Sequence, residues 1–247
     1  MSGLEYEHLA RGIKKALERD PSALDAERLA TITPEEVATW LDPESLQFPH
    51  LAERTRKVQE VGRVLLACFD GTAANLVRAA RGSAERLVAL VTAHFPGFRD
   101  EAVCRGEQVF FYKRAQIFAA DVWAAYGRRV CADVDCNARP FAFHDVEALT
   151  MFADYRVPQI LRARGVLVYA PALAAAVDAR VEIPYGAEEE VEIRAATVQA
   201  VEMLREALEG MGRPGVMSVV LDWLLWQEGE RAKDALPPHH RTRTVFY

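Results

Sequence analysis

The sequence has no apolar run of the roughly 20 residues that a membrane-spanning helix requires, and its N-terminus, MSGLEYEHLARGIKK, lacks the apolar segment of a signal peptide. Cysteine is scarce as well. The four cysteines show neither CxxC spacing nor the density of a secreted disulfide scaffold. We therefore expect a cytoplasmic protein whose cysteines are free thiols.

An excess of positive charge is also missing. The 30 lysines and arginines are outnumbered by 36 aspartates and glutamates, which gives a net charge of −6. This balance argues against binding of a long polyanion such as intact nucleic acid, whereas a small anionic ligand needs only a local cluster of cations. We expect neither nucleic acid nor membrane as a partner, and nothing in the sequence indicates an obligate protein partner.

Several catalytic and metal-binding signatures are absent: a P-loop, GxGxxG, a nucleophile elbow, HExxH and any internal repeat. His239 and His240 are adjacent, but no third ligand follows at a recognisable spacing, so no metal site is predicted. Strand patterns are limited to residues 109–111 and 166–169. With 51% hydrophobic residues the chain can bury a substantial core, and we expect a mostly α protein with at most short β segments.

Helical spacing of apolar residues and helix-ending signals predict the helices. Thr33-Pro34-Glu35-Glu36 has the pattern of a capping box, with Pro34 in the first helical position. The predicted helices cover residues 6–19, 34–41, 51–69, 72–80, 83–94, 110–126, 145–152, 158–165, 171–180, 187–209 and 216–228. The irregular stretch 128–143 is the best candidate for a loop over a site.

The stretch LTMFADYRVPQIL (149–161) contains the first catalytic candidate, Asp154. Its neighbours are apolar and aromatic, and a carboxylate in such surroundings is either well partnered or perturbed in its pKa. Two plainer roles are open. Asp154 either caps a helix that begins at Pro158, or forms an ordinary surface pair with Arg156.

The helix predicted for residues 216–228 contains a single charge between Gly215 and Gln227, the carboxylate of Asp222. Trp226 follows one turn later on the same face and offers a flat surface to a ring-shaped ligand. The alternative is a buried pair between Asp222 and an arginine elsewhere. Lys113 belongs to a stripe of charged residues along the helix predicted for residues 110–126, and the alternative to a binding role is a ladder of ion pairs within that helix. In the C-terminal tail, Arg241 or Arg243 is a candidate for binding an anion.

Five blocks of sequence together closely resemble the queuosine-salvage N-glycosylase family. They are FYKRAQIFAADVW (111–123), LTMFADYRVPQIL (149–161), YGAEEEVEIRAATV (185–198), LDWLLW (221–226) and HRTRTVFY (240–247). The resemblance implies a helical fold like that of DNA glycosylases and a cofactor-free hydrolase. Its reaction would release queuine, a 7-deazaguanine base, and ribose 5-phosphate from queuosine 5′-phosphate, so that queuine can be salvaged into tRNA modification.

The same resemblance implies roles for particular residues. Asp154 would be the catalytic carboxylate, Asp222 and Trp226 would contact the base, and Met151 and Phe152 would line the same pocket. The candidates for the cations that meet the 5′-phosphate and ribose are Lys113, Arg156, Arg241 and Arg243. Eukaryotic members carry an additional N-terminal portion with aromatic residues near the base, so a more open base site is expected here.

We therefore expect a single helical N-glycosylase domain over residues 1–247, with N-terminal helices in 1–100 and the catalytic blocks in 101–247. Two alternatives differ from hydrolysis of queuosine 5′-phosphate. One is a glycosylase acting on another nucleoside or nucleotide, or on a damaged base in DNA, which the acidic balance disfavours. The other is a non-catalytic protein that binds queuine or its nucleotide.

Overall fold

The computed structural model describes residues 6–41, 50–127 and 140–246. Most of these residues are helical, and the described strands form a single two-stranded sheet, so the prediction of a mostly α protein is confirmed. The chain divides into two compact units. The first comprises Met1–Ala79 with Ala93–Gly97, and the second comprises Ala80–Thr92 with Phe98–Tyr247. The single domain and the likeness to DNA glycosylases stay predictions.

The first unit is a cluster of helices. They are α1 (Tyr6–Arg19), α2 (Ala26–Thr31), α3 (Pro34–Leu41), α4 (Leu51–Cys68) and α5 (Ala73–Ala79). α4 packs against α2 and α3, and α1 packs against α3. All but α2 follow the sequence prediction to within about two residues. α2 is short, and its six residues give too little periodicity to be recognised.

Two local features explain how these helices begin and pack. The capping box is confirmed: the Thr33 N–H donates to Glu36 Oε2 (2.9 Å), and the Glu36 N–H donates to Thr33 Oγ1 (3.2 Å). Gly62 lets α4 approach α2, because a Cβ at this position would lie 2.2 Å from the backbone nitrogen of Ala30.

The second unit contains the sequence blocks of interest. Its longer elements are β1 (Glu101–Cys104), β2 (Glu107–Phe110), α7 (Lys113–Val122), α8 (Arg156–Ala163), α9 (Pro171–Asp178), α10 (Glu188–Gly210) and α11 (Ser218–Ala232). The helix α6 (Ala84–His94) begins in this unit and ends in the first, and the short turn Pro96–Phe98 leads from the first unit back to the second. Short helical turns of the second unit occupy Trp123–Gly127 and Val146–Ala148. Among the described helices, none is long and apolar enough to span a bilayer.

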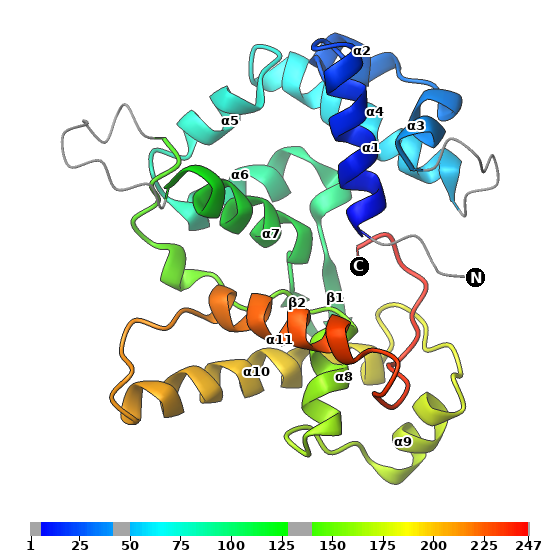
Figure 1. The fold of residues 1–247 in the computed structure, drawn as a ribbon, viewed down its shortest axis with the longest axis vertical. Coiled ribbons are helices and arrows are strands. Elements are labelled where there is room, and N and C mark those ends of the chain that lie inside the picture. Colours follow the sequence, from blue (N-terminus) through cyan, green and yellow to red (C-terminus); the bar gives the residue numbers. More distant parts are fainter. Residues whose placement is uncertain (1–5, 42–49, 128–139, 247) are drawn as a thin grey trace. The chain divides into compact units, whose positions relative to one another are not determined.

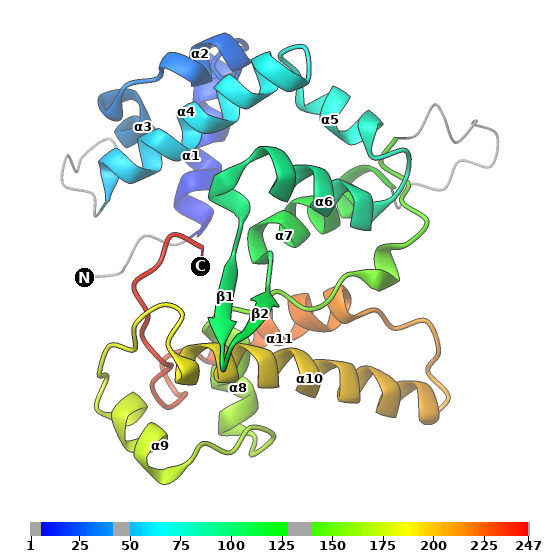
Figure 2. The same ribbon diagram turned by 180° about the vertical axis from the view of Figure 1, so that it is seen from behind.

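α8, α10 and α11 pack against one another (Figure 1). Their apolar faces enclose a buried cluster to which Met151, Val157, Val201 and Leu225 belong. The antiparallel strands β1 and β2 reach the same assembly at α10 (Figure 2). A two-residue turn, Arg105-Gly106, joins the strands, and both residues have positive φ, as a type I′ turn requires.

Several predicted boundaries in this unit are wrong or shifted. The strand predicted at 109–111 overlaps β2, which ends at Phe110, whereas residues 166–169 form no strand. The helix predicted from Phe110 begins only at Lys113, because Phe110 ends β2 and Tyr112 has φ 47°. Lys113 is therefore the first residue of α7, and the predicted stripe that it begins lies within the helix.

The helix predicted for residues 145–152 is also wrong, since only Val146–Ala148 form a short 3₁₀ turn. Beyond it the chain runs extended, and its backbone donors bond to distant side chains. The Thr150 N–H donates to Gln116 Oε1 (2.9 Å), and the Phe152 N–H donates to Asp222 Oδ1 (2.9 Å). These tertiary bonds replace the helical ones and hold the stretch that leads to Asp154.

Candidate active site

Asp154 lies between this extended stretch and α8, and it is 6% exposed. Its Oδ1 accepts hydrogen bonds from the backbone N–H groups of Arg156 (2.8 Å) and Val157 (3.1 Å). The carboxylate therefore caps α8, as considered from the sequence, although the helix begins at Arg156 and not at Pro158. Among the described residues nothing hydrogen-bonds to Oδ2. One carboxylate oxygen is thus held by the start of α8, and the other accepts no hydrogen bond from the described residues.

Asp222 is the second buried carboxylate of the site, 4% exposed on α11. Its Oδ1 accepts the hydrogen bond from Phe152 that was described above. In the described part of the chain no arginine forms an ion pair with it, so the alternative of a buried arginine pair is wrong. Burial raises the pKa of Asp222 well above its usual range, and the negative charge of Asp154 raises this pKa further. The Phe152 hydrogen bond and the charge of Lys113 act in the opposite direction.

The raised pKa of Asp222 makes stability depend on pH. Because the folded state binds this proton more tightly than the unfolded state does, ionising Asp222 costs more free energy in the folded protein, and this cost to stability disappears as the pH falls from the folded pKa toward the unfolded one. Asp222→Asn keeps an acceptor for the Phe152 N–H. We expect a higher free energy of unfolding than wild type at about pH 8 and no gain at about pH 4, measured by urea unfolding.

The matched control is Asp178→Asn. Asp178 is exposed, and Arg162 lowers its pKa by hydrogen bonding, so this variant should lose stability at neutral pH instead. A loss of stability in Asp222→Asn at every pH would contradict the prediction.

The predicted base contacts differ in how they are placed. Met151 and Phe152 are 1% and 3% exposed, and Met151 belongs to the buried cluster between α8, α10 and α11. Trp226 is half-buried on α11 and packs against the same cluster. The structure thus brings the two carboxylates and these apolar residues into one unit, and the roles of the apolar residues in base binding stay predictions.

Arg156 is held firmly at the start of α8. It forms an ion pair with Glu230 of α11 (Nε to Oε1, 2.6 Å), and its Nη1 donates to Gln159 Oε1 (2.6 Å). A surface pair between Asp154 and Arg156 is therefore wrong, because both side chains are buried and the arginine pairs elsewhere. The absence of a side chain at Gly229 makes room for it, since a Cβ there would lie 2.8 Å from Arg156 Cγ and Cδ.

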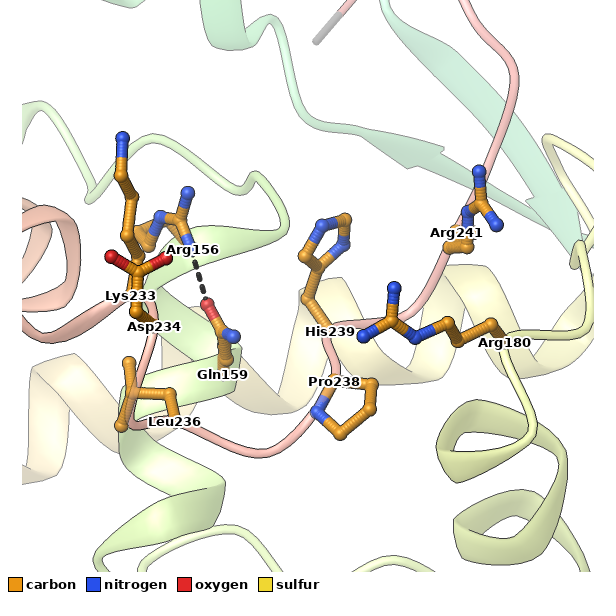
Figure 3. A pocket seen from close by; sticks show the side chains of 9 residues that line it. All are labelled: Arg156, Gln159, Arg180, Lys233, Asp234, Leu236, Pro238, His239 and Arg241. Atoms are coloured by element: carbon orange, nitrogen blue, oxygen red, sulfur yellow. Dashed lines mark hydrogen bonds between the residues drawn. The ribbon is translucent and has the colours of Figure 1, made fainter. Parts of the chain in front are cut away.

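Arg156 also lines a pocket of about 420 Å³ (Figure 3). The other lining residues are Gln159, Arg180, Lys233, Asp234, Leu236, Pro238, His239 and Arg241. Of the four cations predicted to meet a phosphate, this pocket contains Arg156 and Arg241. The charge of Lys113 lowers the pKa of Asp222, and Arg243 is exposed and forms an ion pair with Glu182 (3.8 Å). Neither of these two lines the pocket.

A buried network of charged side chains, which the sequence did not reveal, holds the backbone just before Asp154. Asp100, Glu190 and Arg194 are all 0% exposed. The Arg194 guanidinium donates to Asp100 Oδ2 (2.5 Å) and Glu190 Oε1 (3.2 Å), and its Nε donates to the carbonyl of Ala153 (3.0 Å). Arg194 thereby fixes the peptide directly before the catalytic candidate. The only sequence signal is the four-residue spacing of Glu190 and Arg194 on one helix.

The described residues contain no group of three or more His, Cys, Asp or Glu side chains placed to hold a metal ion. The site offers carboxylates and cations. Asp154 can stabilise positive charge or orient a water molecule, and the pocket cations can bind an anion.

The sequence of this chain is similar to those of several named proteins. The model of a family described as "Queuosine salvage protein" matches residues 2–247. A queuosine 5′-phosphate N-glycosylase/hydrolase of Dictyostelium discoideum is 46% identical over 246 residues, covering 100% of this chain and 73% of that protein. Proteins with the same name from Sphaerobacter thermophilus (47% over 242 residues, 98% and 72% covered) and Mus musculus (33% over 251 residues, 98% and 72% covered) also match.

Proposed function

This chain belongs to the queuosine salvage protein family, and on that premise we propose that it hydrolyses the N-glycosidic bond of queuosine 5′-phosphate. The products are queuine and ribose 5-phosphate. We place the reaction in the cytoplasm and assign it no cofactor and no obligate protein partner. The observation that supports the proposal most directly is the environment of Asp154. Only Oδ1 of its carboxylate accepts hydrogen bonds from the described residues, and the side chain is buried near a second carboxylate and next to a cationic pocket.

The reaction breaks the bond between ribose C1′ and a base nitrogen. The bonding electrons leave with the base, positive charge develops on the sugar, and water adds to C1′ while a proton passes to the departing base. A carboxylate close to C1′ stabilises the developing charge or directs the water. In this proposal Oδ2 of Asp154 acts on the sugar, while Oδ1 keeps the carboxylate in place through its two backbone hydrogen bonds.

Queuine lacks the ring nitrogen that many purine hydrolases protonate, because it is a 7-deazaguanine. Its departure must therefore be helped by hydrogen bonds to the rest of the base. We propose that Asp222 bonds to the guanine-type N–H edge and that Phe152 or Trp226 stacks on the ring, with Met151 beside them.

The test is release of free queuine by the purified chain, measured by chromatography with three substrates in parallel: queuosine 5′-phosphate, the nucleoside queuosine, and guanosine 5′-phosphate. We expect turnover of queuosine 5′-phosphate above all. Preferred turnover of another substrate would indicate a glycosylase of different specificity. Tight binding of queuine with no turnover of any of the three by folded protein would indicate a carrier.

A further inference from the structure

The extended stretch 150–154 contains two of the proposed base contacts and ends at the catalytic candidate. Within the described part of the chain it forms no backbone–backbone hydrogen bond. Its backbone groups bond instead to side chains from three helices, namely Gln116 of α7, Asp222 of α11 and Arg194 of α10. Because no neighbouring strand pairs with this stretch, its placement depends on these three side chains and on the packing of its apolar residues.

Gln116 differs from the other two side chains because it is uncharged and uses both ends of its amide. Its Oε1 accepts a hydrogen bond from the Thr150 N–H (2.9 Å). Its Nε2 donates to the carbonyl of Phe111 (2.9 Å) and to Thr150 Oγ1 (3.0 Å). One amide group therefore joins the backbone before α7 to the start of the stretch. Its orientation is fixed, because a reversed amide would set an acceptor against the Phe111 carbonyl.

Thr150 connects Gln116 to the proposed base contacts. Its hydroxyl donates to the carbonyl of Met151 (3.0 Å), the first of these contacts. Phe152 follows, and its N–H donates to Asp222 Oδ1. The two buried side chains are thus held on one side through Gln116 and on the other by Asp222.

Asp154 is held by other groups. Its carboxylate caps α8, and Arg194 donates to the carbonyl of the residue before it. Loss of the Gln116 amide should therefore displace the base contacts and leave the carboxylate that acts on the sugar in place.

We propose that Gln116 is a positioning residue for recognition of the base, which holds Met151 and Phe152 where they contact the base without touching it itself. The inference rests on the proposed function and deepens it, because it makes affinity for the base depend on a hydrogen-bonded glutamine behind the apolar contacts.

The first experiment uses Gln116→Met, which removes both ends of the amide at similar volume. We expect KM for queuosine 5′-phosphate to rise and the affinity for free queuine to fall, each about 10-fold, with kcat within about 3-fold of wild type. Binding of ribose 5-phosphate, measured by calorimetry alongside queuine, should not change. Gln199→Met is the matched control, because Gln199 is exposed on α10.

A pair of variants at Thr150 follows the same hydrogen bonds from the other side. Thr150→Ser keeps the hydroxyl that joins Gln116 to the Met151 carbonyl, and Thr150→Val removes it at nearly the same volume. Thr150→Ser should bind queuine as wild type does. Thr150→Val should show part of the loss in Gln116→Met, because its N–H still donates to Gln116.

The pKa of Asp222 reports the position of Phe152 without any substrate. The hydrogen bond from the Phe152 N–H lowers this pKa, so displacement of Phe152 in Gln116→Met should raise it further. Gln199→Met should leave it unchanged. Carboxyl resonances in NMR measure the difference, which a general loss of stability alone would not produce.

The outcomes separate this inference from the function on which it rests. If wild type turns over queuosine 5′-phosphate but Gln116→Met binds queuine equally well, or loses kcat with KM unchanged, the positioning role is overturned and the function stands. If wild type binds queuine without turnover, the function is overturned, and the positioning role stands or falls with the queuine affinity of Gln116→Met. A wild type that neither turns over queuosine 5′-phosphate nor binds queuine overturns both.

Discussion

Asp154→Asn is expected to lower kcat for queuosine 5′-phosphate by about 10²–10⁴-fold while leaving the fold intact. Asparagine keeps an oxygen that accepts the hydrogen bonds from Arg156 and Val157, so the cap of α8 survives. What it removes is the negative charge that the developing cation on the sugar requires. Single-turnover kinetics with purified protein measure the chemical step directly.

Asp154→Ala separates the two roles of this carboxylate, because it removes both the charge and the cap. We expect the same loss of kcat as in Asp154→Asn and, in addition, a loss of about 1 kcal/mol in the free energy of unfolding. Asp178→Asn is the control for a carboxylate outside the site. If Asp154→Asn keeps wild-type turnover, Asp154 is a structural cap only. If neither form turns over but both bind queuine equally, the chain is a carrier.

The charge of Asp154 can also be detected through the pKa of Asp222. Since the negative charge of Asp154 raises the pKa of Asp222, Asp154→Asn should lower that pKa toward its usual range. The shift can be followed by carboxyl resonances in NMR. It would show that the two carboxylates interact, independently of any substrate.

Helices were predictable from the sequence where local signals decide. Thr33 and Glu36 bond to each other within one turn, and Pro171 opens α9 in the position that its ring prefers. The stretch from Leu149 to Asp154 was not predictable, because its conformation depends on partners far along the chain. Thr150 bonds to Gln116, 34 residues away, and Phe152 bonds to Asp222, 70 residues away.

The two aspartates of the candidate site were predictable from the sequence, and several of the charged residues around them were not. Asp154 and Asp222 stood out because each is a charge in apolar surroundings, and the structure buries both. Arg194 did not stand out, because a glutamate-rich helix reads as a solvated face and its partner Asp100 lies 94 residues away. Arg180 and Lys233 gave no signal either, since a pocket built from four separate segments leaves no pattern in any one of them.

Arg194→Met is expected to lower the free energy of unfolding by about 3–5 kcal/mol, the largest stability effect we predict. The substitution leaves Asp100 and Glu190 buried without their cation and removes the donor to the Ala153 carbonyl. Arg205→Met is the matched control on the same helix, because Arg205 also pairs with glutamates but is only half-buried, at 32% exposed. Exposed pairs stabilise little, so its loss should be much smaller. Urea unfolding followed by circular dichroism measures both variants.

A third variant tests whether the loss in Arg194→Met comes from stranded charges or from lost packing. Combining Arg194→Met with Asp100→Asn and Glu190→Gln removes all three charges at nearly constant volume. If buried unpaired carboxylates cause the loss, this triple variant should recover a large part of the stability. It should still turn over more slowly than wild type, because the Ala153 carbonyl before Asp154 has then lost its Arg194 donor. Equal losses in Arg194→Met and Arg205→Met would contradict a stabilising role for the network, and full activity in the triple variant would contradict its role in positioning Asp154.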